Sequence, residues 1–192
     1  MRPPPHPDTL FLSNVTNTHP HPATPTHPIP LFRSLRAVAV FVVRHGCGFD
    51  LWPTKAKLPD SGFAYNYSVA HSSAYQGGKG DLAQQFVESC RKFNVTPGFY
   101  AQVANNAYLN VSGNKMMPGA QLTLAQYQKI TLLQLEELWS NYGEIGEAWF
   151  DGGIPESFAG DILELFTRLQ PKAVMFQGPG HNAGESWVGY HG

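Results

Sequence analysis

Between residues 37 and 177, short apolar runs alternate with longer amphipathic segments. Four of the runs have the length and composition of buried strands, and they cover residues 37–43, 96–103, 144–151 and 172–177. Asp81, Thr123 and Ser157 stand where helices would begin between or after these runs. An order of strand, helix and strand predicts right-handed crossover units on a parallel sheet, so we expect an α/β protein.

The expected helices have recognisable ends and apolar stripes. Thr123 with Gln126 forms a capping-box pattern, and Pro171 would end the third helix. Asp81 would cap the first. The expected apolar stripes are Leu82, Phe86, Cys90 and Phe93 in the first helix, Leu124, Tyr127, Leu135 and Leu138 in the second, and Ile162, Leu165, Phe166 and Leu169 in the third.

Two folds fit this alternation, the doubly wound sheet and the (β/α)8 barrel. No dinucleotide or Walker motif follows a strand, and the glycine-rich segment 77–81 lacks the Ser or Thr that would follow its lysine. Polar residues follow several strands instead, namely Arg44-His45-Gly46, Gln102, Asn105-Asn106 and Asp151-Gly152-Gly153. Such groups at strand ends favour a barrel, which typically takes about 250 residues. We therefore expect an incomplete (β/α)8-type barrel of about four strand–helix units.

A change of composition near residue 34 divides the chain. Residues 1–33 hold nine of the 16 prolines and four of the eight histidines, which predicts a disordered Pro/His-rich arm. The arm lacks the apolar stretch of a secretory signal peptide. Residues 34–192 would form the partial barrel. The formal net charge of −1 argues against a nucleic-acid or membrane partner.

The segment 144–151 carries the most distinctive chemistry. Alternation along a strand would place Glu147, Trp149 and Asp151 on one face, with Asp151 at the carboxyl end before two glycines. A carboxylate beside an indole suits a glycosidase, because the carboxylate can attack or stabilise an oxocarbenium-like centre while the ring packs on the sugar. The alternative interpretation is an ordinary Asp-Gly turn.

Several stretches, in order along the chain, carry a resemblance to a known family. They are His45–Pro53 (HGCGFDLWP), Gly78–Asp81 (GKGD), Pro97–Tyr100 (PGFY), Leu138–Glu144 (LWSNYGE), Trp149–Gly153 (WFDGG), Phe176–Pro179 (FQGP) and Trp187–Gly189 (WVG). In these motifs the chain resembles the plant-type alpha-L-fucosidases. The resemblance runs from about Val38 to the last residue.

The resemblance implies a retaining glycosidase that removes terminal alpha-linked L-fucose from glycans without a cofactor or metal. It implies that Asp151 is the nucleophile, that His45 contacts fucose hydroxyls, and that Trp52 and Tyr100 line the sugar pocket. Trp149 would bind substrate beside Asp151. From the residues alone, Trp52 or Tyr100 could instead belong to the core. His45 shares strand parity with Phe41 and Val43, so it is expected to point into the barrel.

The acid/base position departs from the family pattern. The resemblance places His191 where relatives have a glutamate, and Glu185 is a nearby carboxyl displaced in register. Either residue is therefore a candidate acid/base. The alternative function is a non-catalytic fucose-binding relative or an inactive fragment.

Four Asn-x-Ser/Thr sequons favour an extracellular or apoplastic location. They begin at Asn14, Asn66, Asn94 and Asn110, and Asn94 could be buried because it precedes a strand. Together with the resemblance they suggest a secreted, extracellular or apoplastic glycoprotein, although the chain shows no signal peptide. The expected partner is a fucosylated glycan.

Overall fold

The computed structural model describes residues 37–178 and 190–191. These form an α/β fold. Its strands and helices, in chain order, are β1 (Val38–Arg44), η1 (Val69–His71), η2 (Gln76–Gly78), α1 (Leu82–Lys92), β2 (Thr96–Ala101), η3 (Ala107–Leu109), β3 (Val111–Ser112), β4 (Lys115–Met116), α2 (Leu124–Asn141), β5 (Glu147–Trp149), α3 (Glu156–Leu169), β6 (Val174–Phe176) and β7 (Tyr190–His191).

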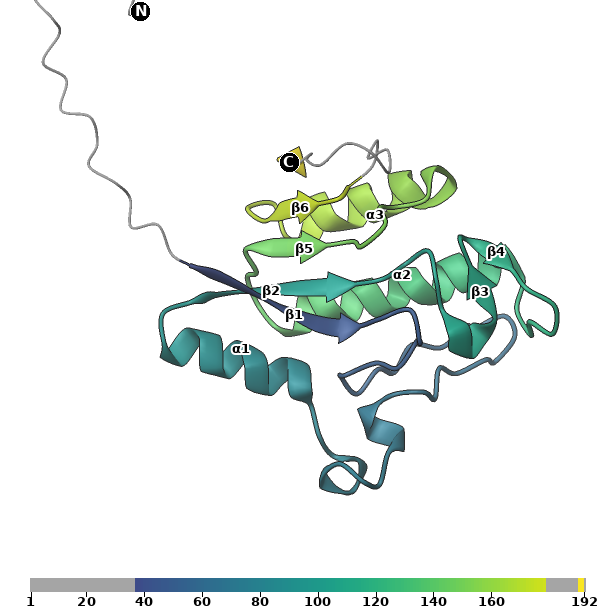
Figure 1. The fold of residues 1–192 in the computed structure, drawn as a ribbon, viewed down its shortest axis with the longest axis horizontal. Coiled ribbons are helices and arrows are strands. Elements are labelled where there is room, and N and C mark those ends of the chain that lie inside the picture. The colour runs from purple at the N-terminus through teal and green to yellow at the C-terminus, as the bar shows by residue number, and fades with distance from the viewer. Residues whose placement is uncertain (1–36, 179–189, 192) are drawn as a thin grey trace, which may run out of the picture. The chain divides into compact units, whose positions relative to one another are not determined.

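The main sheet has the strand order β1-β2-β5-β6-β7. The first four strands are parallel, as the sequence predicted, and their arrows point the same way in Figure 1. β7 differs, because it pairs with β6 in the antiparallel direction. β3 and β4 form a separate antiparallel pair at the carboxyl ends of β1 and β2 (Figure 1).

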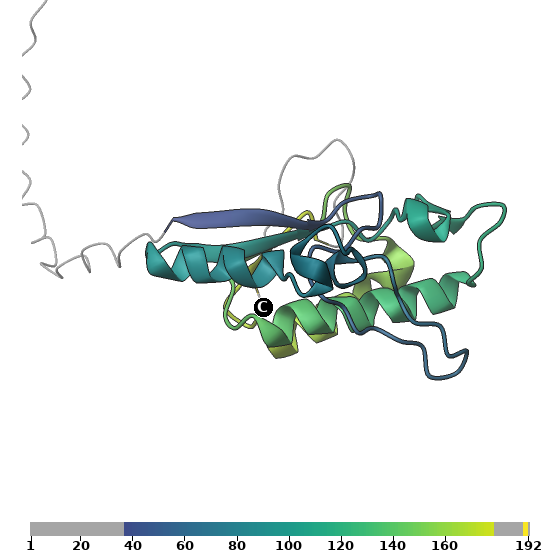
Figure 2. The ribbon, with the colours of Figure 1, turned by 90° about the horizontal axis from the view of Figure 1, so that it is seen from below.

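Among the described residues, the helices cover only one face of the sheet. Figure 2 shows the sheet nearly edge-on with α1, α2 and α3 on one side. The side chains of Val43, Phe99, Ala148 and Met175 point to that side and are buried in the main hydrophobic core. The opposite face carries partly exposed side chains, including those of Val42 and Trp149.

A bulge interrupts β1 just before its carboxyl end. Val42 pairs with Tyr100, but Arg44 pairs with Ala101, so β1 uses one more residue than β2 over this interval. A bulge shifts the alternation of side chains by one position. Arg44 therefore turns to the helix-covered face, where its side chain is buried.

The helix boundaries follow the predictions closely for α1 and α2. Asp81 caps α1, and the Thr123–Gln126 capping box of α2 is present with both of its hydrogen bonds. α3 begins at Glu156 after Pro155, one residue before the predicted Ser157. The predicted stripe of α1 was wrong at Phe93, which lies beyond the last helical residue and is 72% exposed.

The predicted arm, residues 1–33, lies outside the described residues and stays a prediction. None of the helices within 37–178 combines the length and the apolar composition needed to cross a bilayer.

Candidate active site

Four predicted site residues meet at the carboxyl ends of the parallel strands. The hydroxyl of Tyr100, from β2, donates a hydrogen bond of 2.7 Å to Oδ2 of Asp151, which follows β5. The Tyr100 ring stacks on the His45 ring with centroids 6.0 Å apart. The Trp149 ring packs edge-on against the Tyr100 ring, with centroids 5.5 Å apart. The structure therefore groups the Asp151 carboxylate with three aromatic side chains.

The electrostatics of the Tyr100–Asp151 pair favour a neutral phenol beside the carboxyl group. Burial raises the pKa of Tyr100, and the hydrogen bond and negative charge of Asp151 raise it further. Tyr100 consequently remains a donor at neutral pH. Oδ1 of Asp151 receives no hydrogen bond from the residues that the structure describes, so this oxygen is available to react.

Gln177 was not predicted to have a role, and the structure places it in the site. Its side-chain Oε1 accepts a hydrogen bond of 3.2 Å from Nε1 of Trp149 and one of 3.0 Å from the backbone N–H of Gly152. These bonds fix the indole and the turn that carries Asp151. Its position directly after the fourth parallel strand was the signal that could have identified it.

The parity argument for His45 was wrong, although His45 does lie beside Tyr100. Phe41 and Val43 face the helices, since Phe41 stacks on Phe86 of α1 and Val43 is buried in the core. The bulge before Arg44 reverses the alternation, so His45 emerges on the opposite face.

Trp52 lies in the core, which corrects the expectation that it lines a sugar pocket. Its side chain is 1% exposed within the main hydrophobic cluster. Its Nε1 donates a hydrogen bond of 2.9 Å to Glu137 of α2, whose carboxylate also accepts from Thr54 at 2.6 Å. Trp52 thus anchors the segment after β1 to the helix layer.

A buried ionic cluster lies beneath the bulge. Arg44 and Asp50 are almost fully buried and 3.9 Å apart, and Gln134 of α2 bridges them. Gln134 accepts from Nη1 of Arg44 and donates to Oδ2 of Asp50 at 2.6 Å. Burial raises the pKa of Asp50 well above its ordinary value, against the opposing influence of the Arg44 charge. The cluster holds the backbone that presents His45.

The two acid/base candidates are not brought next to Asp151 by the described residues. Glu185 lies outside them. The backbone of His191 pairs with Val174 at the amino end of β6, whereas Asp151 follows the carboxyl end of β5. Both assignments stay predictions. No cluster of three or more metal-ligating side chains occurs within residues 37–178.

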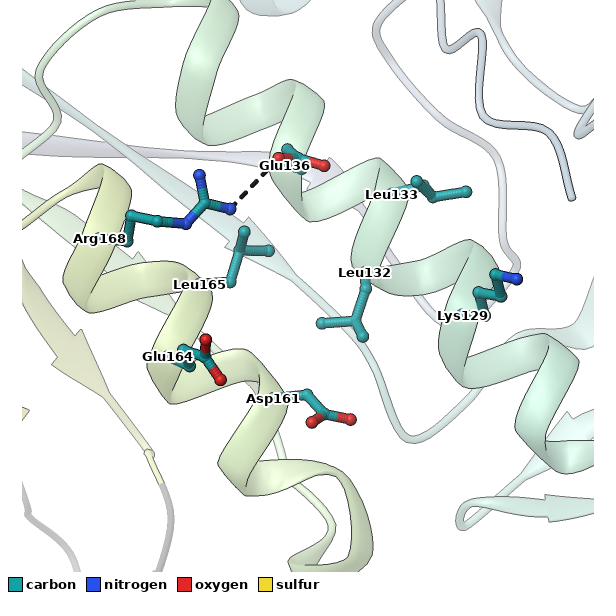
Figure 3. Close-up of a pocket in the computed structure, with 8 residues that line it drawn as sticks. All are labelled: Lys129, Leu132, Leu133, Glu136, Asp161, Glu164, Leu165 and Arg168. Atoms are coloured by element: carbon teal, nitrogen blue, oxygen red, sulfur yellow. Dashed lines mark hydrogen bonds and ion pairs between the residues drawn. The ribbon is translucent and has the colours of Figure 1, made fainter. Parts of the chain in front are cut away.

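A hollow of about 310 Å³ lies elsewhere, between α2 and α3 in the helix layer (Figure 3). Its rim includes an ion pair of 3.3 Å between Arg168 and Glu136, both partly exposed. Leu132 and Leu165 contribute apolar surface between the two helices. None of its lining residues comes from a strand end, so it is separate from the candidate site.

The chain shares sequence and fold with proteins of known class. A family model described as alpha-L-fucosidase matches residues 38–181. Alpha-L-fucosidase 1 of Arabidopsis thaliana is 28% identical over 156 residues, which cover 78% of this chain and 27% of that protein. The chain therefore spans about a quarter of the length of this curated relative.

Solved structures agree with the sequence comparison. The crystal structure of a "putative alpha-L-fucosidase" from Bacteroides thetaiotaomicron matches with a TM-score of 0.62 and 27% identity, over 72% of this chain and 31% of that one. Alpha-L-fucosidase AlfC from Lactobacillus casei, in complex with alpha-L-fucose product, matches with a TM-score of 0.58 over 73% of this chain and 47% of that one. At 22% identity, the second likeness concerns the fold alone.

Proposed function

The chain belongs to the alpha-L-fucosidase family, and from this premise we propose that its site hydrolyses terminal alpha-linked L-fucose with retention of configuration. The observation that carries the proposal is the carboxylate of Asp151, oriented by Tyr100 and left with one free oxygen between aromatic rings. A retaining glycosidase needs a nucleophile of this kind in this setting.

In the proposed first step, Oδ1 of Asp151 attacks the anomeric carbon of fucose. The bond from that carbon to the glycosidic oxygen breaks, and the leaving oxygen takes a proton from a general acid. In the second step, water gives a proton to the same group acting as base and attacks the anomeric carbon. The ester bond to Asp151 then breaks and releases fucose.

The remaining site residues bind and orient the sugar in this proposal. His45 offers ring nitrogens to fucose hydroxyls, and its stacking on Tyr100 fixes its plane. Trp149 packs against the apolar face of the sugar, and Gln177 holds its indole in place. His191 and Glu185 are the proposed alternatives for the acid/base.

The proposed architectural role of the sheet is one part of a (β/α)8-type barrel. Its helices cover one face, and the carboxyl ends of its parallel strands carry the site, as in barrel enzymes. The uncovered face would then look into the barrel. Residues 1–33 would be an arm outside it.

We further propose that the protein is secreted and glycosylated. Three of its sequon asparagines, Asn66, Asn94 and Asn110, are exposed, so the expectation that Asn94 could be buried was wrong. Exposure is what a glycosylation acceptor requires. The fourth, Asn14, lies outside the described residues.

Hydrolysis of an activated aryl fucoside tests the proposed activity. The parent chain should release the aryl group, whereas Asp151→Ala should not. Azide or formate added to Asp151→Ala should restore part of the reaction by entering the space left by the carboxylate. Equal activity of the parent and Asp151→Ala would remove Asp151 from the nucleophile role.

Comparison of two substrates tests the acid/base candidates. His191→Glu should raise hydrolysis of a fucosyl glycan more than that of the aryl fucoside, because a basic leaving group needs more acid assistance. Selective loss of glycan hydrolysis in Glu185→Gln would assign the acid role to Glu185. A folded chain that binds fucose but hydrolyses neither substrate would be a non-catalytic relative.

A further inference from the structure

A partly exposed aromatic surface, formed by Phe49, Tyr67 and Tyr108, lies beyond the residues assigned to fucose. Tyr67 stacks on Tyr108 with ring centroids 4.6 Å apart and an interplanar angle of 22°. Phe49 meets Tyr67 edge-on at 5.0 Å. Tyr67 and Tyr108 are 38% and 39% exposed. We call these three residues the aromatic platform.

Buried groups hold the platform from below. Tyr65 is 2% exposed and packs edge-on against Tyr108 at 5.5 Å. The Tyr65 hydroxyl donates to the carbonyl of Gly48 and accepts a hydrogen bond of 3.0 Å from the side chain of Asn106, which is fully buried and caps η3. The Tyr108 hydroxyl donates to Asn66. The rings are therefore fixed before any ligand arrives, which lowers the entropy cost of binding.

The platform is attached directly to the segment that follows His45. The backbone N–H groups of Ala107 and Tyr108 donate to the carbonyls of Gly46 and Cys47, at 2.8 and 3.2 Å. The N–H of Asp50 donates to the carbonyl of Tyr67 at 3.1 Å. These bonds place the Cα of Tyr108 within roughly 15 Å of that of His45. The platform thus lies at the carboxyl end of β1, close to the fucose site.

The chemistry of the platform suits a neutral ring with apolar C–H faces and hydroxyl edges. The exposed parts of these rings offer apolar contact, and the hydroxyl of Tyr67 offers hydrogen bonds. No charged side chain belongs to the platform. A sugar residue has this combination of surfaces, and a glycosidase must accommodate the sugar on the leaving-group side of the bond that it cleaves.

We propose that the aromatic platform binds the sugar residue to which fucose is attached. The proposal rests on the proposed fucosidase function and adds to it a subsite for the leaving sugar. The site would then prefer fucosylated oligosaccharides to free fucose, with Tyr67 and Tyr108 supplying the preference.

Binding measurements on the 192-residue chain, produced without N-glycans because Asn66 heads a sequon, test the subsite. The probes are L-fucose, a disaccharide of alpha-linked fucose on N-acetylglucosamine, and methyl β-N-acetylglucosaminide. Asp151→Asn serves as the background so that the disaccharide is not consumed. We expect the disaccharide to bind about fivefold more tightly than fucose, from the added apolar contact.

Variants made in the Asp151→Asn background test whether the preference for the disaccharide depends on the platform or on any exposed aromatic residue. Tyr108→Ala and Tyr67→Ala should each remove most of the fivefold preference and leave fucose affinity within twofold. Tyr108→Phe should keep it, because the ring remains. Phe93→Ala is the matched control, since Phe93 is an exposed aromatic residue before β2, at the amino end of the sheet. Circular dichroism verifies that each variant is folded.

The outcomes distinguish failure of the subsite from failure of the fucosidase proposal. Equal affinities for fucose and the disaccharide, or an unchanged preference in Tyr108→Ala and Tyr67→Ala, would overturn the subsite alone. Absence of fucose binding would overturn the function. In that case the NMR resonances of the Tyr67 and Tyr108 rings, followed during a titration with methyl β-N-acetylglucosaminide, still test the platform. Ligand-dependent shifts of these resonances would support sugar binding by the platform, and their absence would overturn it.

Discussion

Gln134→Leu removes the bridge between two buried ionisable side chains, and we expect a large loss of stability. Gln134 of α2 is fully buried and hydrogen-bonds to both Arg44 and Asp50. Nε and Nη2 of Arg44 already have no partner among the described residues. Leucine fills a similar volume but can neither donate nor accept, so both buried side chains would lose a hydrogen bond without gaining water.

The size of the loss follows from the two bonds. A buried polar group that is left without its hydrogen bond costs about 1–3 kcal/mol, so the two groups give about 2–6 kcal/mol. Single domains are stable by about 5–15 kcal/mol in total. For a domain of this size, the same loss lowers the melting temperature by roughly 4–24 °C. The variant is therefore expected to fold only marginally.

Urea unfolding followed by circular dichroism measures the change, with Gln128→Leu as the matched control. Gln128 lies on the same helix but is partly exposed, and its side-chain hydrogen bond to Ser157 is 3.4 Å long. Its replacement should change the unfolding free energy by less than about 0.5 kcal/mol. A loss below about 1 kcal/mol in Gln134→Leu would show that the ion pair reorganises or is hydrated, and would refute the reasoning.

Three further changes test the site and its supports. Tyr100→Phe should lower kcat/KM on an aryl fucoside about 10- to 100-fold while the fold is retained, because the carboxylate of Asp151 loses its donor; unchanged kinetics would contradict this. Trp52→Phe should lower stability by about 1–3 kcal/mol in urea unfolding without changing fucose affinity, since Trp52 lies in the core. Gly98→Ala should destabilise by about 1–3 kcal/mol, because a Cβ would lie 2.9 Å from the carbonyl oxygen of Glu147; a neutral effect would show that β5 can shift.

Local signals in the sequence predicted the elements well. The capping box of Thr123 and Gln126 involves residues three apart, so it can be recognised without knowledge of the fold. The parallel order of the main strands followed from the alternation with helices. The antiparallel β7 could not be anticipated in this way, because alternation of strands and helices predicts only parallel pairing, and β7 pairs with β6 in the antiparallel direction.

The site residues were predicted less evenly, and the errors have a common cause. His45 was assigned to the site by the resemblance, but its expected shared face with Phe41 and Val43 was wrong, because burial of Arg44 under α2 accompanies a bulge in β1. Trp52 was assigned to the pocket, yet its partner Glu137 is 85 residues away in the sequence. Asp151 and Trp149 were expected on one face, and in the structure both contact Tyr100.

Glu147 offers a pH-dependent test of the uncovered face. Its side chain lies on the same face as Trp149, half-buried and without a hydrogen-bond or ion-pair partner among residues 37–178, and burial raises its pKa above the ordinary value. An acid whose pKa is raised in the folded state contributes stability that is full below the unfolded pKa and is lost as the pH rises through the folded pKa. Glu147→Gln removes this dependence.

We therefore expect Glu147→Gln to be more stable than the parent at pH 7, with the difference disappearing near pH 4. Glu144→Gln is the control of opposite sign. Lys172 lowers the pKa of Glu144 through a hydrogen bond and its charge, so this change should slightly reduce stability at pH 7 and have a smaller effect near pH 4. Urea unfolding of the three proteins at both pH values measures the contrast. A Glu147→Gln variant no more stable than the parent at pH 7 would show that water solvates the carboxylate fully. The uncovered face would then be an ordinary wet surface, which would weaken the proposal that it looks into a barrel.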